Sequence, residues 1–121
     1  MKRQMKRDGL AVALCLPGGF LLSSAWSAPA ACDVFSYTPT MFTSYEVGGT
    51  GGRAGCASTV SVQTYLKYDR WGPDGVTAHR GGRVTNITWT PHGCSGGQAY
   101  FTQTSSETGQ YSRSANRTLS C

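Results

Sequence analysis

The sequence TVSVQTYLKY, residues 59–68, decides the fold class of this chain. Its side chains alternate with a period of two, which is the period of a β-strand and not of a helix. One face of the strand carries the more apolar side chains, namely Val60, Val62, Thr64, Leu66 and Tyr68. The other face carries Thr59, Ser61, Gln63, Tyr65 and Lys67. We therefore predict a strand over residues 59–68 whose first face is turned toward a core.

The rest of the chain beyond residue 30 has the same character. Thr, Ser, Gly, Val and Tyr dominate it, no helical period occurs, and Gly or Pro clusters punctuate it about every ten residues. Further strands are predicted at residues 84–90, 99–103 and 117–121, with weaker candidates at 33–37 and 41–47. Turns are predicted at residues 69–75 and 106–109, and the glycine-rich residues 48–52 are expected to be too flexible for a ladder.

The aromatic residues divide between core and surface in this scheme. In residues 99–103, Ala99 and Phe101 alternate against Tyr100 and Thr102. Phe101 and Trp89 suit the core, whereas polar-face or turn positions hold Tyr65, Trp71, Tyr100 and Tyr111. About seven strands without a helix predict an all-β fold, a two-sheet antiparallel immunoglobulin-like sandwich.

The first thirty residues have the pattern of an export signal. Four basic residues open it: Lys2, Arg3, Lys6 and Arg7. An apolar run over residues 10–22 follows, and small residues permit cleavage after Ser27 or Ala30. The run is shorter than the ~20 residues that a membrane span needs. We therefore expect residues 1–30 to be a signal peptide, and residues 31–121 to form a single secreted, extracellular domain without a membrane span.

The charge of the predicted mature domain is modest. The whole chain carries 11 basic and 6 acidic residues, but four of the bases and one of the acids lie in the predicted signal. Seven basic against five acidic residues leave a net charge of +2. The arginines are scattered along the chain, whereas a surface that follows nucleic-acid phosphates needs them clustered. No nucleic-acid partner is expected.

The cysteines agree with export. Cys15 leaves with the signal, and Cys32, Cys56, Cys94 and Cys121 remain, which predicts two disulfides in an oxidising compartment. Three pairings are possible and the sequence alone does not choose between them. We favour Cys32–Cys56 and Cys94–Cys121, each of which could stabilise the fold by about 3–4 kcal/mol. No C-x-x-C or H-x-x-x-H pair occurs, so neither a metal site nor another cofactor is expected.

One motif resembles catalytic machinery. Residues 93–97, GCSGG, match the G-x-S-x-G pattern of a hydrolase nucleophile. That motif requires a strand-to-helix turn and a histidine later in the chain, whereas no histidine follows Ser95 and Cys94 is expected to be bridged. The two histidines, His79 and His92, have no acid or cysteine at a spacing that suggests pairing. No catalytic residue is predicted, and residues 93–97 are interpreted as a turn.

The predicted turn at residues 69–75 is a candidate binding loop. It contains Arg70 and Trp71, and exposed aromatics beside arginines are typical of interaction surfaces. A loop stiffened by disulfides loses little entropy on docking, which suits an enzyme inhibitor.

Several stretches resemble a group of small secreted actinobacterial proteins with four cysteines. They are GCASTVSV at residues 55–62, DRWGPD at 69–74, residues 94–102 and the final TLSC. In size, export, cysteine number and strand pattern the chain is also similar to the adaptor subunits of Streptomyces umbrella toxin particles. This resemblance implies that residues 31–47 face a lectin subunit and that strand edges serve a repeat-built toxin subunit. The candidate partner-binding residues are then Phe35, Tyr37, Phe42 and Tyr45, together with Arg70 and Trp71 of the loop.

A second resemblance is to the tendamistat family of α-amylase inhibitors, on Gly55-Cys56-Ala57 and the alternating strand that follows. It implies a sandwich with two sequential disulfides. The inhibitory Trp-Arg-Tyr triplet of that family lies between the first two cysteines, where this chain has TSYEV at residues 43–47.

The expected function is therefore a non-enzymatic secreted protein-interaction module, in the first place a toxin-particle adaptor; the alternative is a secreted inhibitor of a hydrolase.

Overall fold

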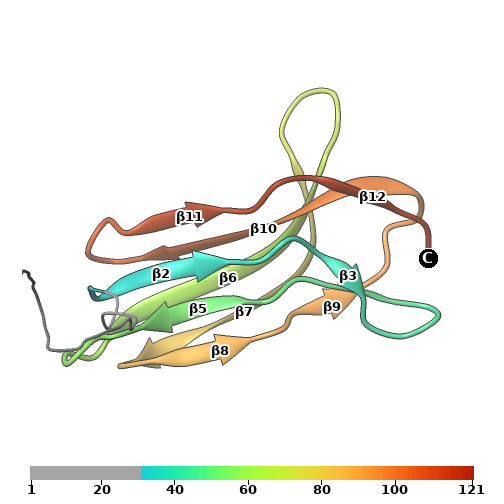
Figure 1. Ribbon diagram of the computed structural model, residues 1–121. Coiled ribbons are helices and arrows are strands. Elements are labelled where there is room, and N and C mark those ends of the chain that lie inside the picture. The colour runs from blue at the N-terminus through green and yellow to red at the C-terminus, as the bar shows by residue number, and fades with distance from the viewer. Residues whose placement is uncertain (1–30) are drawn as a thin grey trace, which may run out of the picture. The chain divides into compact units, whose positions relative to one another are not determined.

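The computed structural model describes residues 31–121, and the predicted signal peptide with its cleavage site and Cys15 lies outside the described residues. Over residues 31–121 the chain is all-β, as predicted (Figure 1). Its strands are β2 (Asp33–Ser36), β3 (Thr40–Met41), β4 (Val47–Gly48), β5 (Gly51–Ala54), β6 (Val60–Asp69), β7 (Gly75–Val84), β8 (Ile87–Trp89), β9 (His92–Gly93), β10 (Gln98–Ser106), β11 (Tyr111–Arg113) and β12 (Arg117–Leu119).

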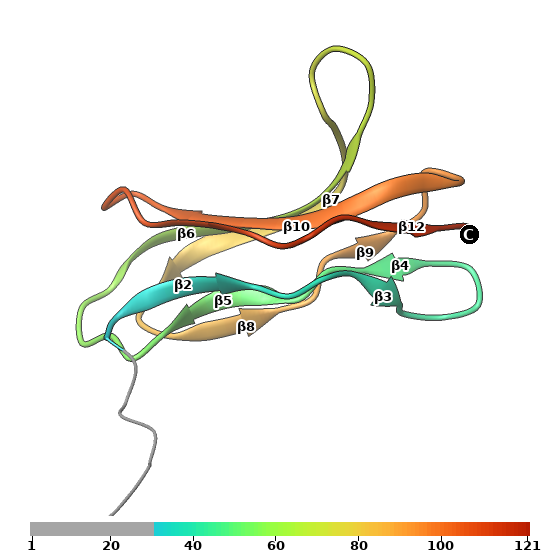
Figure 2. The same cartoon turned by 45° about the horizontal axis from the view of Figure 1, so that its top comes forward.

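These segments form two antiparallel layers (Figure 2). In the first layer the order is β11-β10-β6-β7, with β12 pairing the same edge of the layer as β11. The second layer consists of β2-β5-β8, and β3-β4-β9 continues its three strands. Two hydrogen bonds bridge this continuation, from Tyr37 N to Thr50 O at 2.8 Å and from Gly49 N to Pro91 O at 3.1 Å.

The connectivity is that of an immunoglobulin-like sandwich. The chain first forms a hairpin of β2/β3 with β4/β5 in the second layer, and then the β6–β7 hairpin in the first layer. It returns to the second layer as β8 and β9 and ends in the first layer as β10 to β12. Consecutive segments that lie in line, such as β2 and β3, form one interrupted strand. With the segments joined in this way, the sandwich has about seven strands, as the sequence predicts. The predicted fold class is confirmed.

Prolines explain two of the interruptions. Pro39 stands between β2 and β3, Pro91 stands between β8 and β9, and both are buried. Proline has no backbone N–H to donate to a ladder, so pairing stops at it and resumes beyond it. The second layer is thereby divided into two short sheets that remain in line.

The space between the layers is narrow and partly polar. Thr64, Thr102 and Thr104 of the first layer are fully buried and face Gly49 and Gly51 of the second. A Cβ atom on Gly51 would collide with the Thr104 hydroxyl, and one on Gly49 with the Thr102 hydroxyl. Threonine opposite glycine therefore lets the two sheets approach closely.

The apolar core lies at one end of this space. Val47, Leu66 and Tyr100 are buried there, and the partly buried residues Tyr68, Ala78, Leu119 and Cys121 pack against them. Four members of the predicted core face of residues 59–68 are buried: Val60, Val62, Thr64 and Leu66. That part of the prediction is confirmed.

Four predictions about individual strands and residues are wrong. The predicted strand at residues 41–47 is instead the end of β3, the β3–β4 loop and the start of β4. Residues 48–52 do join ladders, since Gly48 lies in β4 and Gly51 and Gly52 lie in β5. Larger side chains do not fit there, because an added Cβ would collide with Thr104 of the opposite sheet at Gly51 and with the Ile87 carbonyl of β8 at Gly52. The predicted strand at 84–90 is instead the end of β7, a bend at 85–86 and β8. Tyr100, expected on the polar face, is fully buried between the layers.

Both disulfides follow the favoured sequential pairing. Cys32–Cys56 joins the start of β2 to the residues after β5, with the Cα atoms 4.4 Å apart. Cys94–Cys121 joins the β9–β10 connection to the end of the chain, with the Cα atoms 5.9 Å apart. Each bridge closes one terminal section of the sandwich, and bridges of this kind are typical of small exported domains. Among the described residues, no helix has the length and apolarity to cross a membrane.

Candidate functional site

The six predicted partner-binding residues fall into two groups on different layers. In the second layer, Phe35 lies in β2, Tyr37 directly follows it, and Phe42 and Tyr45 lie in the β3–β4 loop. Arg70 and Trp71 lie in the β6–β7 loop of the first layer. The structure therefore offers two aromatic surfaces.

The first surface is the Trp71 loop, residues 70–74. The side chain of Trp71 is 100% exposed. Arg70 Nε donates a hydrogen bond to the Pro73 carbonyl at 2.7 Å across the loop, and its guanidinium lies 5.8 Å from the Tyr68 ring. Gly72 has a φ of 91°, a backbone conformation that glycine adopts without strain. The loop thus holds a large apolar side chain in water on a cross-braced turn, and it projects beyond the sheets (Figure 1).

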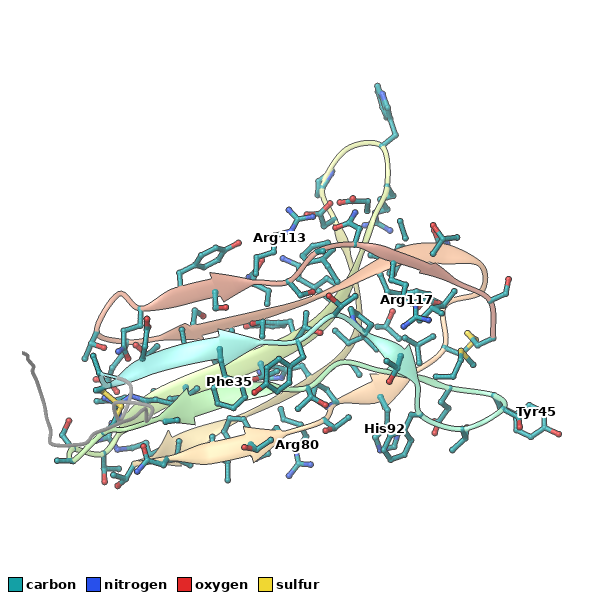
Figure 3. All side chains as sticks on the ribbon, viewed as in Figure 1. Phe35, Tyr45, Arg80, His92, Arg113 and Arg117 are labelled. Carbon is teal, nitrogen blue, oxygen red and sulfur yellow. A yellow bond between two sulfur atoms is a disulfide. The ribbon has the colours of Figure 1, made fainter. Side chains whose placement is uncertain are left out.

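The second surface, the aromatic face, consists of Phe35, Tyr37, Phe42, Tyr45 and His92. The rings of Phe35 and Tyr37 lie 5.3 Å apart. Phe42 packs over Gly48, where an added Cβ would come within 3.0 Å of the Phe42 Cβ, and its ring stacks on His92 with the centroids 4.0 Å apart. Figure 3 shows Phe35 in the middle of the layer, and Tyr45 at the tip of the β3–β4 loop beyond His92.

The β3–β4 loop is tied at its base. The backbone N–H groups of Phe42 and Thr43 both donate to the Glu46 carbonyl, at 2.7 and 3.2 Å. The Glu46 carboxylate lies 3.1 Å from His92 Nδ1, so the loop is also fixed to β9. Tyr45, with 80% of its surface exposed, is therefore presented by a closed turn.

His92 is a member of this surface that the sequence did not assign to it. No acidic residue lies near His92 in the chain, and its partners Phe42 and Glu46 come from the β3–β4 loop about 50 positions earlier. Only the pairing of β4 with β9 brings them together. Spacing along the sequence carried no signal for this contact.

The outer face of the first layer carries a row of alternating rings and cations. The rings of Tyr65 and His79 stack with their centroids 4.6 Å apart. Lys67 Nζ lies 5.8 Å from the Tyr65 ring and 5.9 Å from the Phe101 ring, and Arg113 covers Phe101. Phe101 is buried, as predicted, but beneath these cations and not between the sheets.

The GCSGG segment is held as a turn. The Ser95 hydroxyl is hydrogen-bonded to the Thr77 hydroxyl at 2.8 Å, and the Ser95 N–H donates to the Tyr100 hydroxyl at 3.1 Å. Tyr100 in turn donates to the Gly96 carbonyl. These contacts brace the Cys94–Cys121 bridge. Within residues 31–121, no group of three or more His, Cys, Asp or Glu side chains is placed to hold a metal ion.

One carboxyl group is perturbed, at the far end of β6 from the Trp71 loop. The pKa of Glu107 lies below its ordinary value, chiefly because the backbone N–H of Ser61 donates to Glu107 Oε1 at 2.6 Å. Arg83 of β7, whose Nη1 lies 2.9 Å from the same oxygen, lowers this pKa further. The group is exposed and fixes the end of β7, so its role is structural.

The two aromatic surfaces point in different directions. Figures 1 and 2 both show the Trp71 loop rising from the first layer, while the β3–β4 loop extends past the end of the second. A protein held by one loop would leave the other accessible. No protein-family model matches the chain, and neither the curated proteins nor the solved structures include a match to it.

Proposed function

We propose that this protein is a secreted, non-enzymatic interaction module that holds two partner proteins at once. The observation that carries the proposal is Trp71, a fully exposed tryptophan on a cross-braced loop. Tryptophan is the side chain most enriched at binding hot spots, and leaving it in water is unfavourable. Because the loop is already ordered, docking it costs less entropy than ordering a flexible one.

The aromatic face supports a second, separate contact. Tyr37, Phe42 and Tyr45 are exposed and Phe35 is half-buried, and the Glu46 carboxylate has a partner within the face, His92. Such a surface suits a largely apolar partner patch. The resemblance to umbrella-toxin adaptors implies that residues 31–47 face a lectin subunit and that strand edges serve a repeat-built toxin subunit. The Trp71 loop joins β6 to the edge strand β7, so we propose that it contacts the toxin subunit together with that edge. Two disulfides in a small domain, with the predicted signal peptide, favour an extracellular place for this assembly.

The test is co-purification of the tagged protein from culture medium, comparing two single variants. We expect Trp71→Ala to lose one partner and Tyr45→Ala to lose the other, since each truncates an exposed ring on a different surface. Tyr111→Ala is the matched control, because Tyr111 is 60% exposed but lies on β11. Recovery of the wild type only as a free monomer, or loss of both partners in every variant, would refute the adaptor.

A hydrolase inhibitor is the second candidate, and the stiffness of the Trp71 loop favours it. The bond from Arg70 to the Pro73 carbonyl pre-forms the loop, as rigid inhibitor loops require. In that case the purified protein alone inhibits a hydrolase at nanomolar concentration, and Trp71→Ala abolishes inhibition. Inhibition with no co-purified partner would favour this function over the adaptor.

A further inference from the structure

We propose that the free edge of β7, residues 79–84, binds an extended acidic segment of a partner protein as an added strand. The sequence of this edge is HRGGRV. This edge would be one of the contacts of the proposed adaptor. The inference rests on the proposed function in one respect, namely that a partner protein supplies the acidic segment.

Of the sandwich edges, β7 is the longest continuous strand, and its one irregularity is a bulge at Thr77, before residues 79–84. The β2/β3 edge is interrupted at Pro39 and the β8/β9 edge at Pro91. The edge opposite β7 is divided between β11 and β12. β7 is ten residues long, contains no proline and pairs only with β6 in the part of the chain that the structure describes. Unpaired backbone of this length is a template for another strand.

Part of this edge is already covered, which defines the free part. At Thr77, the side chain is hydrogen-bonded to Ser95, and an added Cβ on Gly93 would lie 3.1 Å from Thr77 Cγ2 and 3.4 Å from the Thr77 carbonyl. The connection through residues 93–95 therefore blocks the first residues of β7. Beyond it, His79, Arg80, Gly81 and Arg83 are exposed. Gly81 and Gly82 carry no side chain that would shield the backbone.

The charge of the edge selects the partner. β7 has two arginines, one histidine and no acidic residue. Arg83 has an acidic neighbour, Glu107, at 2.9 Å. No ion pair of Arg80 occurs among residues 31–121, and its side chain extends beyond the strands in Figure 3. Carboxylates on an added strand would complement this edge and speed the encounter.

The same charges disfavour several registers of self-pairing at this edge. When two β7 edges pair antiparallel, residues opposite each other lie on the same face of the joint sheet. In the registers centred on residue 80 or residue 83, Arg80 or Arg83 lies opposite the same arginine of the other copy, and like charges directly opposite each other in a sheet are destabilising. A segment of opposite charge meets no such repulsion.

The two arginines also set the spacing of the acidic residues. Arg80 is opposite Thr64, whose side chain points between the layers, whereas Arg83 is opposite Ser61 on the outer face. The guanidiniums thus leave β7 on opposite sides. A strand that engages both needs carboxylates three positions apart, because residues at odd separations point to opposite faces.

The experiment uses three synthetic peptides of about six residues, built on alternating Thr and Val. One has glutamates at positions i and i+3, one has lysines at the same positions, and one has glutamates at i and i+2. We expect the first to bind at least about tenfold more tightly than either comparator. Its binding should slow amide hydrogen exchange at residues 79–84 and weaken as salt is added.

Arg80→Glu should weaken the first peptide by about tenfold or more, whereas Arg117→Glu, an exposed arginine of β12, should not. Equal binding of the lysine peptide, exchange protection at residues 70–74 instead, or self-association of the wild type through β7 would overturn the proposal. Retention of both partners by Arg80→Glu, with no peptide binding, would overturn the edge proposal and leave the adaptor. Peptide binding without any co-purified partner would refute the adaptor alone.

Discussion

The guanidinium carbon of Arg113 lies 3.7 Å from the centroid of the Phe101 ring. Phe101 points away from the opposite sheet, yet it is fully buried, because Arg113 covers one part of it and Lys67 another. A cation over an aromatic face is attracted by the ring quadrupole, and its aliphatic stem buries apolar surface. Arg113 thus shields from water a phenylalanine, Phe101, that would otherwise be exposed on the outer face of the first layer.

Arg113→Ala should therefore lower the free energy of unfolding by about 1–2 kcal/mol, through lost cation–π attraction and exposure of Phe101. Urea denaturation measures this directly. Arg117→Ala removes an exposed arginine from β12 and should change stability by no more than about 0.5 kcal/mol. Equal losses in the two variants would contradict the covering role.

Gly51→Ala should destabilise the sandwich by about 1–3 kcal/mol, because the new methyl group collides with the Thr104 hydroxyl of the opposite sheet. Gly82→Ala is the matched control. There the nearest atom to an added Cβ is Trp89 Cζ2 at 3.9 Å, an ordinary contact. Thermal unfolding of both variants should show a clear drop for Gly51→Ala only, and a similar drop for Gly82→Ala would argue against close sheet contact as the cause.

Tyr100→Phe should cost about 1–2 kcal/mol, since it removes the donor to the Gly96 carbonyl and leaves the Ser95 N–H without its acceptor. We expect faster amide exchange at residues 95–97 in this variant. Tyr45→Phe, at a ring that is 80% exposed, serves as the control and should leave both stability and exchange unchanged. Unchanged exchange in Tyr100→Phe would mean that the disulfide alone orders this turn.

The pKa of Glu107 provides a test by pH. This pKa is lower in the folded protein than in the unfolded chain, because Ser61 N–H and Arg83 favour the charged carboxylate. The stabilisation is present above the ordinary glutamate pKa and is lost as the pH falls through the folded value. Side-chain NMR titration should give a midpoint below the ordinary one, and Glu107→Gln should reduce the fall in stability between neutral pH and about pH 3. Parallel pH profiles of the two proteins would contradict this.

The strand at residues 59–68 was predictable because its alternation is unambiguous. Its buried face could be identified because the face with Val62 and Leu66 is more apolar than the other face of the same strand. Residues 99–103 lack this asymmetry, since Phe101 on one face is matched by Tyr100 on the other. The sequence could not reveal that Arg113, from another strand, would cover Phe101 and leave the interior to Tyr100.

The strands rich in glycine were missed for a different reason. Glycine predicts flexibility when it is considered alone, whereas Gly49 and Gly51 are required by threonines about 50 positions later. The candidate surfaces divide in the same way. Arg70 and Trp71 were found from a local turn motif, but the contact of Phe42 with His92 depends on strand pairing across the sheet and had no local signal.

The positions of the two disulfides have a mechanical consequence. A pull on the two ends of residues 32–121 passes from Cys32 directly to Cys56, and from Cys94 directly to Cys121. The first hairpin and the last three strands are then bypassed, and only residues 57–93 can be drawn out. At about 3.5 Å per residue, the extensible length falls from roughly 310 Å to roughly 130 Å. When it is pulled at residues 32 and 121, the domain would therefore extend by less than half of its contour length.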